Sequence, residues 1–176
     1  MGKDYERLLH EHVEKTSIDE AFARFNHEQK PILEVYLAQV HNRKIAFIDT
    51  CLRKSNLGNA MGRVDYLVQE GKAYGGNTRG YISVASDLEK IASMQAYAHG
   101  LTESELYDHI FVHEYIHAAL DLEGKGVVEE DEVFAMMADY FAWQKEQNIE
   151  IYSPEKLIRL YDSAATRLHE EQKDVA

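Results

Sequence analysis

The chain has 176 residues, of which 45% are hydrophobic and 28% charged, and its formal net charge is −12 at pH 7. This length fits one domain with a sizeable core. The acidic balance argues against a nucleic-acid partner, because phosphate binding needs clustered Lys and Arg. A single cysteine, Cys51, excludes an internal disulfide and agrees with a reducing compartment. Neither a secretory signal nor an apolar run of about 18–20 residues is present, so we expect a cytoplasmic protein that does not bind membranes, with leaderless export left open.

The first half of the chain predicts helices followed by a small sheet. Helices are expected over residues 3–41, where apolar residues recur at helical spacing, although 31–40 also fits a strand. Short apolar or alternating runs over 45–86, separated by glycine-rich turns, predict the sheet. We expect residues 80–86 to form an edge strand that an extended peptide substrate could pair with.

The second half predicts three long helices. Thr102 and Glu105 form a capping box that begins the first of them, and glycines at 124 and 126 end it. The next helix follows at once, so these two are expected over 102–148. Ser153 before Pro154 marks the start of a last helix over 154–172. Together these elements predict a single α+β domain over residues 1–176, mostly helical, with a small β-sheet.

The candidate functional residues lie in the run HEYIH, from His113 to His117. Residues four apart share one face of a helix, so His113 and His117 would present two imidazoles to one point. Zinc accepts imidazole nitrogens, and a catalytic zinc keeps one position for water beside three protein ligands. Glu114 is placed to accept a proton from that water. Most neighbouring residues are uncharged, so the helix reads as buried, and buried imidazoles need partners such as a metal.

A third ligand is expected from the following helix. If the two helices run antiparallel about a turn near Lys125, His117 lies eight residues before it and Glu132 seven after it, at equal depth. Glu132 is therefore the preferred ligand. Glu129 and Glu130 are the alternative ligands. They lie nearer the turn and toward solvent, where acidic residues also favour the first turn of a helix without binding a metal.

Two further acids on these helices are assigned other roles. Asp121 shares the histidine face but lies one turn beyond the pair, too far along for a common tetrahedral centre. Asp139 shares the face of Glu132 and could orient a ligand histidine through its other ring nitrogen.

The motif and the downstream helix resemble the gluzincin zinc metallopeptidases. The likeness covers residues 109–143 and includes the run Glu132-Val133-Phe134-Ala135, which is similar to the "E-x-F-A" helix of lethal-factor-type and Pro-Pro endopeptidases. It is looser to ImmA-type peptidases. The resemblance implies hydrolysis of a peptide or protein substrate by a zinc-bound water, with Zn²⁺ held by His113, His117 and Glu132 and with Glu114 as general base.

Other interpretations stay open from the sequence. One is a zinc-stabilised structural or interaction domain with a closed four-ligand shell and no peptidase activity. Another is a helical interaction domain in which HEYIH is accidental. A side chain that stabilises the oxyanion is also expected in a peptidase; the candidates are Tyr140, Tyr152, Tyr161 and His109. The substrate and the oligomeric state are not determined.

Overall fold

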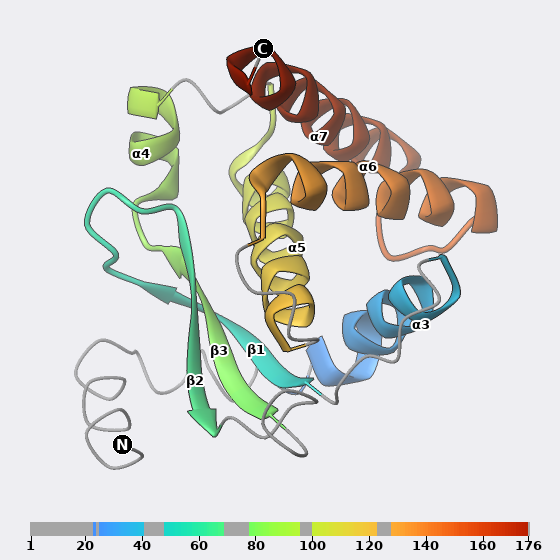
Figure 1. The fold of residues 1–176 in the computed structure, drawn as a ribbon, viewed down its shortest axis with the longest axis horizontal. Helices are drawn as coiled ribbons and strands as arrows, with labels where there is room; N and C mark the ends of the chain where they lie inside the picture. The colour runs from blue at the N-terminus through green and yellow to red at the C-terminus, as the bar shows by residue number, and fades with distance from the viewer. Residues whose placement is uncertain are drawn as a thin grey trace.

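Helices make up most of the described chain, and a small sheet lies beside them (Figure 1). The computed structural model describes residues 23, 25–40, 48–68, 78–95, 100–122 and 128–175. Within these ranges the predicted α+β class is confirmed, and none of the helices is both long and apolar enough to cross a bilayer. The helices predicted before residue 23 lie outside the described residues. The elements are η1 (Phe25–Gln29), α3 (Lys30–Val40), β1 (Ile48–Ser55), β2 (Gly62–Val68), β3 (Thr78–Ala85), α4 (Leu88–Gln95), α5 (Glu103–Leu122), α6 (Glu130–Gln147) and α7 (Pro154–Val175).

The three described strands pair in the order β1-β3-β2. β2 and β3 are antiparallel, as expected for neighbouring runs of alternating residues, and Val64 pairs with Ile82. β1 is parallel to β3 and pairs Leu52 with the same Ile82. The prediction that residues 80–86 form the edge strand is therefore wrong, because β1 occupies the other side of β3. Among the described strands, β2 is the edge nearest the site.

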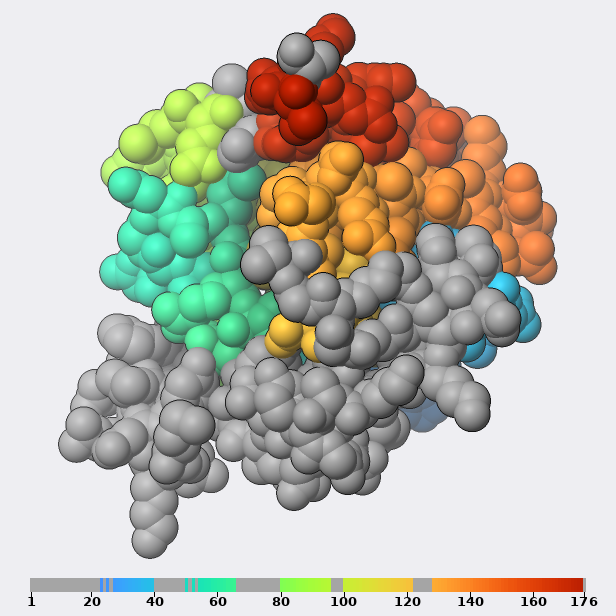
Figure 2. Space-filling model, viewed as in Figure 1, coloured from blue at the N-terminus to red at the C-terminus, as the bar shows by residue number. Residues whose placement is uncertain are grey.

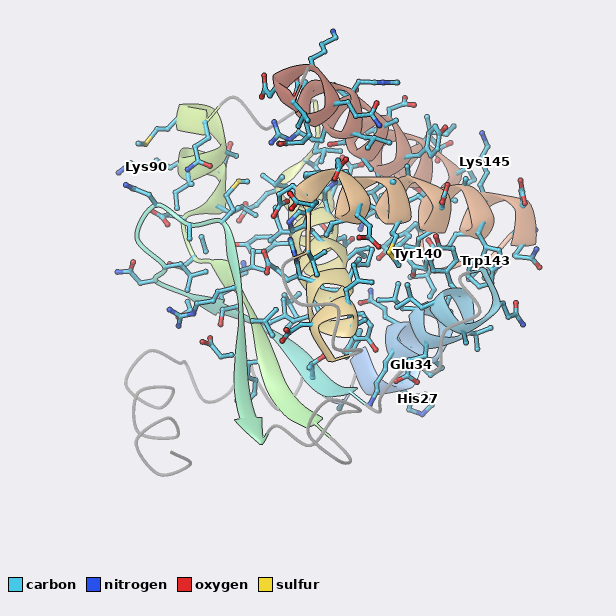
Figure 3. All side chains as sticks on the ribbon, viewed as in Figure 1. His27, Glu34, Lys90, Tyr140, Trp143 and Lys145 are labelled. Carbon is cyan, nitrogen blue, oxygen red and sulfur yellow. The ribbon has the colours of Figure 1, made fainter. Side chains whose placement is uncertain are left out.

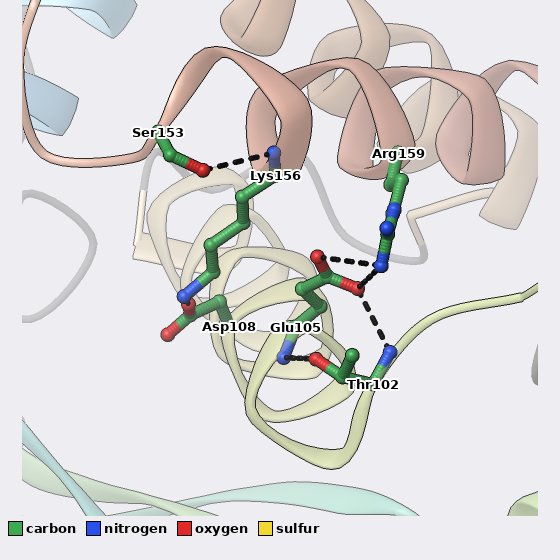
Figure 4. Close-up of polar contacts among 6 residues, drawn as sticks. All are labelled: Thr102, Glu105, Asp108, Ser153, Lys156 and Arg159. Atoms are coloured by element: carbon green, nitrogen blue, oxygen red, sulfur yellow. Dashed lines mark hydrogen bonds and ion pairs between the residues drawn. The ribbon is translucent and has the colours of Figure 1, made fainter.

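The capping box predicted before α5 is confirmed. The backbone N–H of Thr102 donates to Glu105 Oε2 (2.8 Å), and the N–H of Glu105 donates to Thr102 Oγ1 (3.3 Å) (Figure 4). These two bonds satisfy donors that the first turn of a helix leaves without intrahelical partners. The helix then runs through the centre of the molecule. It buries Phe111 and Tyr115 in one apolar cluster, and Leu106 and Ile110 in a second cluster with the sheet and α4.

Two ion pairs attach α7 to the first half of α5 (Figure 4). Lys156 pairs with Asp108, and Arg159 Nη1 lies 3.4 Å from Glu105 Oε1. The carboxylate of Glu105 thus both caps α5 and contacts α7. The N-cap predicted for α7 is also present, because the backbone N–H of Lys156 donates to Ser153 Oγ (3.2 Å).

The helix that follows α5 passes across it. Figure 1 shows α6 running transversely to α5, so the antiparallel arrangement assumed for these helices is wrong. α6 packs along α7 on one side and reaches α3 on the other, where Tyr36 donates its hydroxyl proton to the Met136 carbonyl (3.0 Å). The rings of Tyr140 and Trp143 lie 5.1 and 5.6 Å from that of Tyr36. Figure 3 shows Tyr140 and Trp143 between α6 and α3. These contacts set the orientation of α6.

The capping box of α5 should make a measurable contribution to the stability of the protein. Thr102→Ala removes one of the two reciprocal bonds and should lower the free energy of unfolding by about 1 kcal/mol in chemical denaturation. Thr166→Ala is the control, since Thr166 is exposed within α7 and caps nothing. Equal stability of the two variants would contradict the role of the capping box.

Candidate metal centre

The two histidines of the HExxH motif meet on one face of α5. Their rings lie 4.7 Å apart between centroids, and the Nε2 atoms of His113 and His117 are 3.0 Å apart. One helical turn separates the residues, which stacks their side chains one above the other. The side chains are 12% and 24% exposed, so both rings are largely packed while their Nε2 edges face a cleft.

A carboxylate from α6 reaches both imidazoles. Glu130 Oε2 lies 3.1 Å from His113 Nε2, and Glu130 Oε1 lies 2.9 Å from His117 Nε2. Glu130 is the first residue of α6, directly after the N-cap residue Glu129. Its side chain is 49% exposed, which leaves one side of the group open to solvent. Among the described residues, His113, His117 and Glu130 form the group of ligand atoms that could hold a metal ion.

The structure thus brings Glu130 to the histidines, whereas Glu132, the preferred ligand of the sequence analysis, is not part of this group. Two residues along a helix rotate the side chain by about 200°, so Glu130 and Glu132 leave α6 on nearly opposite sides. α6 crosses α5, and its first residue, Glu130, contacts both imidazoles. The backbone N–H of Glu132 donates to Asp131 Oδ1 (2.8 Å) within the same turn.

The other acids considered from the sequence lie around this group. Glu129 is exposed before the helix begins. Asp121 lines the cleft beyond His117. Asp139 is exposed on α6. Burial chiefly, and then the negative charge of Asp139, raise the pKa of the Tyr36 phenol, which places Asp139 on the α3 side of the helix. No contact shown for the described residues joins Asp139 to a ring of the histidine pair.

The donor set and its spacing fit zinc. Tetrahedral zinc with bonds of about 2.0–2.1 Å places its ligand atoms about 3.3 Å apart. In this structure the two Nε2 atoms are 3.0 Å apart, and they lie 3.1 and 2.9 Å from different oxygens of Glu130. One ligand atom from each of the three residues lies within 4.8 Å of the others, close enough to surround one ion. Two imidazoles and one carboxylate are also a ligand set that catalytic zinc uses, with one position left for water.

The close contacts in this group shift the pKa values of its side chains. Hydrogen bonds from His113 and His117 hold the pKa of Glu130 well below its usual range. Burial alone would lower the pKa of His117, but the hydrogen bond and charge of Glu130, with the charge of Glu114, raise it overall. Burial raises the pKa of Glu114, against the opposing effect of the two imidazoles. The raised pKa makes Glu114 easier to protonate than an exposed glutamate.

A cleft opens on both sides of Glu114. One pocket of about 230 Å³ extends past Ile110 and Phe134, and another of about 400 Å³ extends past His117 and Val64. Gly62 and Glu114 line both pockets, so the general-base candidate lies where they meet.

Gly62, the first residue of β2, allows the strand to approach this point. A Cβ there would lie 2.6 Å from Ile110 Cγ2 and 2.8 Å from Glu114 Cγ, distances that real Cβ atoms essentially never show. The sequence analysis missed this residue. A glycine at the start of an alternating strand is the signal that could have indicated a close backbone approach.

The four residues predicted as candidates for stabilising the oxyanion lie in different parts of the structure. His109 lines the pocket of about 230 Å³, one turn before His113 on α5. Tyr140 and Tyr152 are buried in the main apolar cluster, and Tyr161 is exposed on α7. Of the four, His109 is the residue that the structure brings to the site.

Comparisons with protein-family models, with curated proteins and with solved structures give no match for this chain. The resemblance to gluzincins therefore stays a prediction from the HEYIH motif and the run that begins at Glu132, and Glu132 is not in the group that the structure brings together.

The identity of the third ligand can be tested by metal affinity. Glu130→Ala should weaken zinc binding more than about 100-fold, because loss of a direct ligand exceeds the effect of losing a residue that only orients one. Glu132→Ala, two residues along the same helix, should change the affinity little. The measurement is competition with a chromophoric zinc chelator. A larger loss for Glu132→Ala would contradict the assignment of Glu130.

The His117–Glu130 pair should also stabilise the metal-free protein over a defined pH range. The pKa of Glu130 lies below its ordinary 4.5, so its contribution is lost as the pH falls through that lowered value. The pKa of His117 lies above its ordinary 6.5, so its contribution is lost as the pH rises through that raised value.

Both contributions are fully present between pH 4.5 and 6.5. Urea unfolding with a chelator present should show that Glu130→Gln destabilises the protein most at about pH 5.5 and much less at about pH 9. A destabilisation that does not change with pH would show that the pair contributes no charge interaction.

Proposed function

We propose that this protein is a zinc-dependent metallopeptidase of the gluzincin type that hydrolyses peptide bonds. The observation that carries the proposal is the convergence of His113, His117 and Glu130 on one point, with Glu114 next to it at the centre of a cleft. Three protein ligands with an exposed side correspond to the open coordination of catalytic zinc, whereas a structural zinc is closed by four.

The residues divide the chemical work between them. His113, His117 and Glu130 would hold the ion, which supplies Lewis acidity to polarise the scissile carbonyl and to lower the pKa of a bound water. Glu114 takes a proton from the attacking water and passes it to the departing amine nitrogen, so that one carboxylate serves first as base and then as acid. The partial burial of Glu114 favours its protonated form between these two steps.

The cleft supports an extended peptide as the substrate. The pockets on either side of Glu114 leave room for residues before and after the scissile bond. β2 is one of the two edge strands of the described sheet and begins at Gly62, against Glu114, where main-chain hydrogen bonds could hold an added strand. The lone Cys51 suits a reducing compartment, and we place the activity in the cytoplasm.

Replacing the general base tests the proposal. Glu114→Gln keeps the shape of the side chain but cannot accept the proton, so hydrolysis of a quenched-fluorescent peptide library should fall by about 10²- to 10⁴-fold. Zinc content after purification should stay equimolar. Glu103→Gln, an exposed glutamate in the first turn of the same helix, is the matched control and should keep full activity. Unchanged hydrolysis in Glu114→Gln would overturn the mechanism, and zinc without hydrolysis in the wild type would leave a metal-binding domain.

A further inference from the structure

The pocket of about 230 Å³ beside the metal centre has apolar walls and one strongly basic side chain. Met61, Leu106, Ile110 and Phe134 supply apolar surface, and Arg167 reaches the pocket from α7. Figure 2 shows α6 at the surface directly beside α7, the two helices that carry Phe134 and Arg167. Among the described residues that line this pocket, Arg167 is the one Lys or Arg.

Arg167 is held in a stack that leads to the metal centre. Its guanidinium carbon lies 5.5 Å from the centre of the Phe134 ring, and that ring lies 4.9 Å from the ring of His113. The Arg167 side chain is only 14% exposed. A guanidinium packed on an aromatic face has a restricted orientation, so the binding of a ligand would cost the Arg167 side chain little further conformational entropy.

The acidic partners of Arg167 can be exchanged. Arg167 Nη1 lies 2.9 Å from Glu170 Oε2, and Nη2 lies 2.8 Å from Glu171 Oε1. Both acids lie one turn further along the same helix, with 46% and 27% of their side chains exposed. Pairs between residues three and four apart on one helix stabilise that helix little, and both acids are partly exposed, so a carboxylate in the pocket can replace one of them on the guanidinium.

The charges around the pocket give this cation a specific role. Glu114, Glu130 and Glu171 also line the pocket, and they would repel an acidic substrate in the absence of a basic residue. Guanidinium binds carboxylates through two parallel N–H···O bonds, which a neutral amide cannot reproduce with the same strength.

We propose that Arg167 is a substrate-binding residue that selects peptides with a carboxylate next to the scissile bond on this side of the cleft. The carboxylate is either an acidic side chain or the free C-terminus of the peptide. The proposal rests on the metallopeptidase function and adds the class of substrate to it.

Three metal-anchored probes separate these cases without requiring turnover. Each carries a hydroxamate, which binds zinc, joined through a succinyl group to Glu-NH₂, Gln-OH or Gln-NH₂. The first offers a side-chain carboxylate, the second a C-terminal carboxylate and the third neither. Calorimetry on the zinc-loaded protein should show that one or both carboxylate probes bind about 10- to 100-fold more tightly than Gln-NH₂, the range expected for a charge-assisted bond.

The variants assign that preference to one residue. Arg167→Met should reduce the ratio to about one, and Arg167→Lys, which keeps the charge but not the paired donors, should retain part of it. Arg159→Met is the matched control, because Arg159 lies on the same helix but pairs with Glu105, away from the pocket, and its ratio should equal that of the wild type. Thermal melting of each variant checks that it is folded.

The outcomes distinguish this inference from the function on which it rests. If all three probes bind with equal affinity, or if Arg167→Met keeps the preference, Arg167 serves only to stabilise its own helix and the inference is overturned. If no probe binds the zinc-loaded protein, the metal centre itself is wrong, and the inference is lost with it.

Discussion

The approach of one carboxylate to two imidazoles is the interaction on which the rest of the site depends. His113 and His117 come from a single helix, so their proximity needs nothing beyond helical geometry. Glu130 comes from the next helix, and its position is set by the packing of α6. That helix is held by the Tyr36–Met136 hydrogen bond on one side and by α7 on the other. α7 is in turn tied to α5 by the Lys156–Asp108 pair. Contacts with α3, α5 and α7 therefore determine the position of the Glu130 side chain.

The cleft around this group is also shaped by residues that are not candidate metal ligands. β2 lies against α5 because Gly62 has no Cβ, and this approach places a strand edge beside Glu114. On the opposite side, Phe134 and Arg167 form the wall of the pocket next to His113. The cleft thus combines a backbone edge, an apolar wall and one basic group around a centre rich in carboxylates. Under the proposed function, the backbone edge would hold the main chain of a peptide and the wall would contact its side chains.

The features predictable from the sequence are local ones. The capping box of Thr102 and Glu105 and the stacking of His113 on His117 depend on residues three and four apart, and both are present. The antiparallel pairing of β2 with β3 likewise followed from neighbouring runs of alternating residues. In each of these cases, the geometry of a single element or hairpin determines which side chains meet.

The features that were missed depend on contacts between distant elements. The number of residues between Glu132 and the turn predicts its level along α5 only if the two helices are antiparallel. α6 instead crosses α5 and packs against α3 and α7. β3 is central because β1 pairs with it on the side away from β2. This pairing is parallel, and no residue pattern in the segment between β2 and β3 indicates it. Arg167 lies on α7, and the whole of α6 separates it in sequence from the HEYIH motif. Its spacing of three and four residues from Glu170 and Glu171 predicts only ion pairs on an exposed helix face.

The most direct test of the account is a crystal structure of the zinc-loaded protein with anomalous data collected at the zinc edge. We expect one strong peak bonded to Nε2 of His113, Nε2 of His117 and the carboxylate of Glu130, with a water at the remaining position about 2 Å from the ion. A zinc ion held by Glu132 in place of Glu130, a fourth protein side chain that closes the coordination, or no peak between the two histidines would contradict it.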